Sequence, residues 1–424
     1  MEETRHNSNN NHLVMKIKSK YILAKVFEYL QQKKGLKIIQ YNKKCQKNFG
    51  KRLIDYKREY SKIIIEIIHC QDKEGKFINI DKKNERYYHI YFNDDEEEVK
   101  KTEITGNDNV KKIKIIIDYE IKSLNNLFMN CDCIKKINFI KYNREDIRIM
   151  RSMFQSCSSL EDLDISKINT INVTNMSSMF LLCRALKNIN LSNFDTGNVT
   201  IMLNMFSNCK RLEKLDLSNF DTRNVTNMCN MFSGCSALKN LDLSHFDTRN
   251  VKDMAFMFGE CSALKKLDLS HFDTGNVKNM SYMFRGCSAL KNLDLFHFDT
   301  RNVTIMHYMF YGCSALEKID LSHFDTRNVI NMSYIFNRCS ILKQIDLSHF
   351  DTRKVTNMNA MFYRCYCLKK LSISDSNMKN FKLKYNFFFK AQEILLEEHS
   401  SEENGKEQHS SSEDSALSLK NSDK

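Results

Sequence analysis

Residues 234–251 read GCSALKNLDLSHFDTRNV, and residues 286–303 read GCSALKNLDLFHFDTRNV. The two stretches start 52 residues apart and differ at one position, where Ser244 corresponds to Phe296. Self-similarity at a fixed spacing is the signature of a repeat protein, in which each unit stacks on its neighbours. The pair therefore indicates a copied structural unit, and its single difference marks a position that the copied architecture leaves free to vary.

The period of the repeat is set by a cysteine that recurs every 26 residues, with a phenylalanine three positions before each one. The cysteines are Cys131, Cys157, Cys183, Cys209, Cys235, Cys261, Cys287, Cys313, Cys339 and Cys365. A run of this kind without insertion or deletion predicts stacked coils. One coil cannot bury its apolar face alone, so stability is expected only in the array.

One repeat unit shows how each coil is expected to fold. Leu241 and Leu243 alternate with polar residues, which is the period of a short strand with one buried face. The polar stretch 247–250 is expected to turn, with Asn250 as the N-cap of a helix. The helix is predicted from apolar residues at spacings of three, four and seven: Val251, Met254, Met257, Phe258 and Cys261.

The predicted fold class is therefore an α/β solenoid, a leucine-rich-repeat-like stack of about ten 26-residue coils. A parallel β-sheet is expected on one face, with helices or helical turns on the other. A small helical segment and a β cap are expected to precede the stack.

The unit resembles a known family. LDLSHFDTRNVKDMAFMFGECSALKK is similar to the 26-residue repeat of bacterial surface proteins and of mycoplasma- or listeria-type lipoproteins, and to BspA-like leucine-rich repeat proteins. The resemblance covers about residues 127–373 and implies a binding or adhesion surface without catalysis. Phe246 stands where the standard repeat has a ladder-forming Asn, so aromatic stacking is expected to hold the corner.

Outward strand positions line the binding face of leucine-rich repeats, and the resemblance implies the same here. Aspartates, histidines and one phenylalanine occupy these columns, which we predict to form a partner-binding face. The residues are Asp216, Asp242, Asp268, Asp294, Asp320, Asp346, His245, His271, His297, His323, His349 and Phe296. Repulsion between stacked like charges favours a role for the aspartates, and harmless copying of solvated residues remains the alternative.

The cysteine column is expected to pack as small buried side chains, because parallel thiols have poor geometry for disulfides. No metal site is predicted, since a ladder spreads ligands instead of converging them. A second aspartate column, which includes Asp247 and Asp273, is expected to bond the corner turn. Asn-Val-Thr triplets such as the one at Asn224 match a glycosylation pattern that the repeat generates automatically.

Composition and motifs argue against several function classes. The 424 residues carry a net charge of +13 and only 11 glycines, and they contain no phosphate-binding glycine loop. Neither a nucleic-acid motif nor a run of about 18 apolar residues is present. We therefore expect no enzyme, no cofactor, no nucleic-acid partner and no membrane span. A cytoplasmic location is expected because no secretory signal is visible, with the cell surface as the alternative.

The ends of the chain do not repeat. We expect a disordered N-terminus over 1–12, a helical segment over 13–75 and a β-rich cap over 76–120, with a hairpin over 76–94 and a strand over 112–118. The repeat region is assigned to 121–373, a C-terminal cap to 374–391 and a disordered acidic tail to 392–424.

Three functions follow as hypotheses. The first is a non-enzymatic protein-binding scaffold that uses the strand face. The second is an F-box-like ubiquitin-ligase substrate adaptor, in which residues 13–50 dock the ligase. The third is a cell-surface adhesin.

Overall fold

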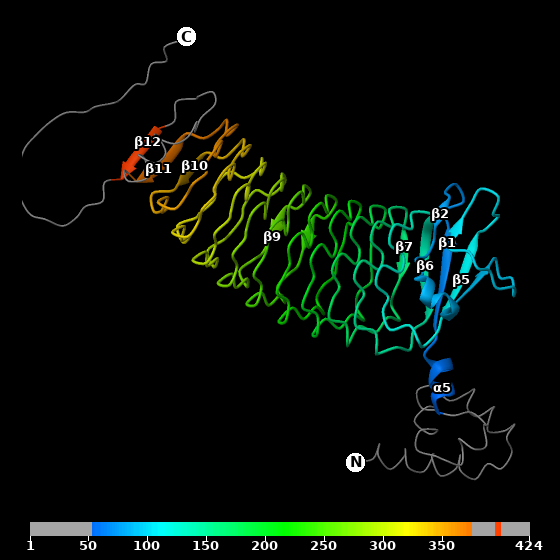
Figure 1. The fold of residues 1–424 in the computed structure, drawn as a ribbon. Coiled ribbons are helices and arrows are strands. Elements are labelled where there is room, and N and C mark those ends of the chain that lie inside the picture. The colour runs from blue at the N-terminus through cyan, green and yellow to red at the C-terminus, as the bar shows by residue number, and fades with distance from the viewer. Residues whose placement is uncertain (1–52, 375–394, 400–424) are drawn as a thin grey trace, which may run out of the picture.

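The computed structural model describes residues 53–374 and 395–399. Within this part the chain winds into a stack of coils that starts at an N-terminal sheet and ends at a short C-terminal one (Figure 1). The segments predicted over 1–12 and 13–50 lie outside the described residues. So do the C-terminal cap predicted over 374–391, apart from residue 374, and the tail predicted over 392–424, apart from residues 395–399.

The N-terminal sheet joins the cap to the coils. Its strand order is β3-β5-β1-β6-β7. The strands are β1 (Ile63–His69), β3 (Tyr88–Phe92), β5 (Lys112–Ile117), β6 (Ile134–Lys141) and β7 (Asp162–Asp164). β6 pairs antiparallel with β1 and parallel with β7. The antiparallel cap thus continues directly into the parallel stacking of the coils.

Two predictions for the cap are corrected. The helical segment over 13–75 contains the helix α5 (Leu53–Tyr60), but its end forms strand β1, whose isoleucines alternate between buried and half-buried. The hairpin over 76–94 is absent because β3 pairs with β5 and β2 (Gly75–Lys76) pairs with β4 (Glu103–Ile104). Between β2 and β3 lies the 3-10 helix η1 (Lys82–Tyr87). The strand expected over 112–118 is present as β5.

The strand face of the coils carries short strands instead of a continuous sheet. The parallel pairs in the coils are β8 (Asn240–Leu241) with β9 (Lys266–Leu267), and β10 (Gln344–Asp346) with β11 (Lys370–Ser374). β11 also pairs with β12 (Leu395–His399). β12 corrects the prediction that residues from 392 onward are all disordered.

The opposite side of each coil, which we call the turn face and which comprises residues 252–260 and their equivalents, is not helical. Met257 and Cys261 donate backbone bonds to residues three positions earlier, at 3.1 and 3.2 Å. Between these bonds, alternate amides bond to the next coil. In one coil these bonds run from Met228, Asn230, Phe232 and Gly234 to the carbonyls of Asp253, Ala255, Met257 and Gly259, at 3.1, 2.8, 3.0 and 2.7 Å.

The predicted helix fails for a steric reason. Equivalent phenylalanine rings in adjacent coils are 5.4–5.9 Å apart, and a helix about 10 Å in diameter does not fit into so thin a layer. Consecutive turns bury the same apolar residues that the predicted helix would have buried, because the spacing of these residues along the sequence suits both structures. Asn250 therefore caps no helix; its side-chain amide donates to the carbonyl of Arg223 in the preceding coil at 2.7 Å.

Three buried columns hold the coils together. The phenylalanine before each repeat cysteine stacks on its equivalents, and Phe232 lies 5.9 Å from the ring on either side. At the corner, the Thr222 hydroxyl donates to the Asp247 carbonyl at 2.9 Å and accepts from the Asp247 amide at 2.8 Å. This threonine column, and not stacking of Phe246, replaces the asparagine ladder of the standard repeat.

The cysteines form the third column. Cys235 is fully buried, and its thiol donates to the carbonyl of Phe206 at 3.1 Å. The same bond recurs along the stack, and no disulfide occurs among the described cysteines. The cysteine column therefore packs as expected from the sequence.

Candidate functional site

The strand face presents the predicted aspartates to solvent. All six side chains of the column, from Asp216 to Asp346, are exposed. Each accepts the backbone amide two residues later, as Asp242 does from Ser244 at 3.0 Å. One carboxylate oxygen is thus engaged in a local turn, which gives every aspartate a structural role whatever else it does.

These turns keep the aspartates charged. Hydrogen bonds from the backbone and hydroxyl of Ser244 lower the pKa of Asp242, and equivalent serines lower the pKa of Asp216, Asp268 and Asp320. At neutral pH the column is therefore a row of negative charges along the outside of the stack.

The predicted histidines are exposed beside this row, and one aromatic residue interrupts the regular pattern. The side chain of Phe296 is 57% exposed. Its ring meets the edge of His323 at 4.2 Å and that of His297 at 5.1 Å. His349 turns toward the stack, where Nε2 lies 2.8 Å from the Leu321 carbonyl. The structure therefore brings Phe296 and two predicted histidines into one cluster.

A groove of about 1030 Å³ crosses four coils of the strand face. Its walls include Phe296 and the carboxylates of Asp294, Asp320 and Asp346. The other three predicted aspartates continue the same column toward the N-terminus, outside the groove. The groove thus contains four of the predicted residues, together with lysines that the prediction did not include.

The missed residues are lysines at the position two residues before the aspartate column, where the last of them precedes Ser372 instead of an aspartate. They occur in alternate coils, as Lys214, Lys266, Lys318 and Lys370, and two of them line the groove. The signal was present in the sequence, because these positions also point outward from the strand. The aspartates are conspicuous because they recur in six successive coils, whereas the lysines occur only in every second coil.

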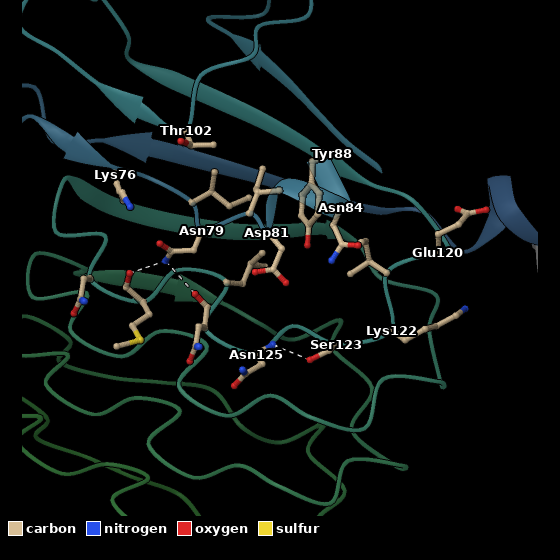
Figure 2. A pocket seen from close by; sticks show the side chains of 17 residues that line it. Lys76, Asn79, Asp81, Asn84, Tyr88, Thr102, Glu120, Lys122, Ser123 and Asn125 are labelled. Carbon is tan, nitrogen blue, oxygen red and sulfur yellow. Dashed lines mark hydrogen bonds between the residues drawn. The ribbon is translucent and has the colours of Figure 1, made fainter. Parts of the chain in front are cut away.

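A second hollow, of about 580 Å³, lies between the cap and the first coil (Figure 2). The amide of Asn79 donates to the carbonyls of Asn126 and Met129 at 3.0 and 2.7 Å, as the dashed lines show. Burial raises the pKa of Tyr88 in its wall to about 12. Because the side-chain amide of Asn79 donates to carbonyls of the first coil, we interpret this hollow as part of the contact that attaches the cap to the coils.

The comparison with known families identifies the repeat. The family described as "Mycoplasma protein of unknown function, DUF285" matches residues 122–215, 204–317 and 288–399. The chain belongs to this family. The predicted resemblance to BspA-like repeat proteins is thereby confirmed.

Two solved structures are similar to this DUF285 protein. One is a leucine-rich repeat protein from Bacteroides ovatus, 20% identical over 67% of this chain and 89% of that one, with a TM-score of 0.27. The other is a leucine rich cell surface protein from Faecalibacterium prausnitzii, 20% identical over 59% of this chain and 70% of that one, with a TM-score of 0.31. No curated protein matches the chain.

Over residues 53–374, no three side chains of His, Cys, Asp or Glu lie together as metal ligands would. None of the helices in the described part has the length and hydropathy needed to cross a membrane.

Proposed function

We propose that this DUF285 protein is a non-enzymatic binding protein that holds a protein partner in the strand-face groove. The groove carries the proposal, because it combines one exposed aromatic side chain with fixed carboxylates and alternating lysines. Aromatic anchors surrounded by polar groups are typical of protein–protein binding sites. Repeated columns also lack the singular constellation of groups that catalysis requires.

Phe296 is the proposed anchor. The matching copy has Ser244 at this position, and both backbones make the same 3.0 Å bond to the preceding aspartate. The phenyl group therefore adds nothing that the turn needs, and 57% of it stays in solvent. Covering such a ring at the centre of an interface is worth on the order of 2 kcal/mol.

The test begins with a photo-crosslinking amino acid placed at position 296 and, as the matched control, at position 244. A partner crosslinked only from position 296 is then purified and titrated against the intact protein and Phe296→Ser. We expect binding to weaken about tenfold or more in the variant. Equal affinity for both proteins would show that the groove is not the binding surface.

A cytoplasmic location is part of the proposal. Protease treatment of intact cells tests it, because an intracellular protein stays uncut while a surface protein is shaved from the cell.

A further inference from the structure

A row of four aromatic side chains lies on the turn face, which is the side of the coils opposite the strand-face groove. We call Phe256, Tyr282, Tyr308 and Tyr334 the aromatic row. Successive ring centroids are 4.1, 4.8 and 4.5 Å apart and the rings are within 9° of parallel. All four side chains are half-buried, so their edges remain accessible.

The backbone does not require aromatic residues at these positions. The four residues have φ between 56° and 60°, in the left-handed region. The same position in the five preceding coils has the same conformation with small polar side chains: Asn126, Ser152, Ser178, Asn204 and Asn230. Asn tolerates this region better than bulky residues do. The change to aromatics in four adjacent coils therefore has a cause other than the fold of the coil.

Arginines lie beside the aromatic row. The guanidinium of Arg285 is 5.8 Å from the ring centre of Tyr282 and 5.4 Å from that of Tyr311. Arg338, which belongs to the following coil, lies 5.5 Å from the centre of the same Tyr311 ring. Attraction between a cation and a ring face holds such side chains in place without neutralising their charge.

Most of this positive charge is uncompensated. Arg285 pairs with Glu260 at 3.3 Å. Arg364 lies 5.2 Å from the ring of Tyr363, and among the described residues no carboxylate forms an ion pair with Arg338 or Arg364. The surface therefore offers two held guanidinium groups to an anionic partner.

The geometry of the rings selects the kind of partner. In the middle of the aromatic row each face is covered by the next ring, and the edge of His307 packs on Tyr282 at 4.8 Å. Nucleic-acid bases and sugar rings bind aromatic side chains through exposed faces. Exposed edges and phenolic hydroxyls instead suit hydrogen bonds and side-chain contacts with a peptide, and Tyr and Arg are enriched in protein binding hot spots.

We propose that the aromatic row, together with Arg285, Arg338 and Arg364, binds an acidic peptide segment of a protein partner. Carboxylates of the peptide accept hydrogen bonds from the guanidinium groups, and its apolar atoms contact the ring edges. This surface is separate from the strand-face groove, so the result of its test does not depend on whether the groove binds a partner.

The first experiment titrates the intact protein with a fluorescein-labelled peptide of about ten residues, mostly glutamate, which at ~3.3 Å per residue spans the aromatic row. Binding is followed by fluorescence anisotropy at physiological ionic strength, where distant charges are screened. We expect the double variant Arg338→Gln/Arg364→Gln to bind about tenfold more weakly than the unmodified protein. The matched control is Arg327→Gln/Arg353→Gln, which removes the same charge from the corner and should bind normally.

Three results would overturn the proposal. They are no saturable binding of the peptide by the unmodified protein, equal weakening by both double variants, or tighter binding of a heparin fragment or single-stranded DNA of equal charge.

A second variant tests whether the rings contribute to peptide binding or only stabilise the stack of coils. Tyr308→Asn installs the residue that Asn204 and Asn230 provide at the same backbone position. We expect a folded protein with at least about a threefold loss of peptide affinity. The control is Asn204→Ala, which should leave affinity unchanged. Unaltered binding by Tyr308→Asn would show that the rings only stiffen the stack, and would contradict the proposal.

Discussion

The strand face and the turn face of each coil differ in what joins them to the next coil. On the strand face, β8 and β9 share two paired residues and β10 and β11 share three, while other coils are joined by single backbone bonds such as the one from the Glu213 amide to the Lys187 carbonyl at 3.1 Å. On the turn face, four backbone amides of one coil bond to the next. Cohesion of the stack therefore comes from the turn face and the buried columns, which leaves the strand face free to carry variable side chains.

The largest effect on stability is expected when a ring is removed from the buried phenylalanine column, which we infer holds the coils together. Phe232→Ala leaves a cavity between Phe206 and Phe258, and we expect a loss of about 3–5 kcal/mol in the free energy of unfolding. Denaturant titration followed by circular dichroism measures it. A loss under about 1 kcal/mol would mean that the column does not hold the coils together.

The threonine column should come next. Thr222→Val keeps the shape of the side chain but leaves the amide and carbonyl of Asp247 without their buried partner. We expect a loss of about 1–3 kcal/mol in the free energy of unfolding. Thr226→Val is the control, because the Thr226 hydroxyl is exposed and makes only a 3.3 Å bond. Equal effects of the two substitutions would contradict a special role for the corner.

The cysteine column predicts a pH dependence. Burial raises the pKa of Cys209 to about 12, above its ordinary value of 9.0. Because the folded state binds the proton more tightly, this contribution to stability is complete below about pH 8.5 and is lost as the pH rises toward 12. Unfolding free energies at pH 7, 9 and 10.5 should therefore fall in that order, and less steeply in Cys209→Ala.

The same burial protects the thiols from reagents. Among the described cysteines of the native protein, the exposed Cys367 should react first with a thiol reagent, ahead of the half-buried Cys70 and Cys229, while the repeat cysteines from Cys131 to Cys339 react only after unfolding. Fast labelling of Cys235 in the native state would be inconsistent with a tightly packed column. Mass spectrometry of labelled peptides identifies the sites.

The smallest effect is expected on the strand face. Asp242→Ser removes one solvent-exposed turn bond and one charge from a row of like charges, and these two effects oppose each other. The free energy of unfolding should change by less than about 0.5 kcal/mol. A loss comparable to that in Thr222→Val would show that the strand face also holds the stack together.

The period of the repeat and its buried positions could be predicted from the sequence, because the cysteines recur without exception and the positions of Leu241, Leu243 and Phe246 stay apolar in almost every coil. The absence of the helix could not be predicted, since consecutive turns and a helix bury apolar residues at the same sequence spacing. The two structures differ in the thickness of the layer that they occupy, and the sequence pattern carries no information on that thickness. Of the residues that line the groove, Phe296 and three aspartates had been named from the sequence as candidates, because Phe296 is an exception in its column and the aspartates recur. The lysines had not been named, because they are a few among many in a basic chain. The aromatic row could not be predicted, because its four side chains stack only when the backbone at these positions is in the left-handed region, which the sequence pattern does not reveal.

Strand β6 has a consequence for how the protein is made. Among the described residues it is the only strand of the N-terminal sheet that pairs antiparallel on one side and parallel on the other, so the antiparallel part of that sheet is present once the chain has been synthesised through residue 141. Every later coil adds 26 residues to a surface that already exists. The stack can therefore grow in one direction during translation, and its length is set by the number of gene-encoded repeats rather than by any contact between its two ends.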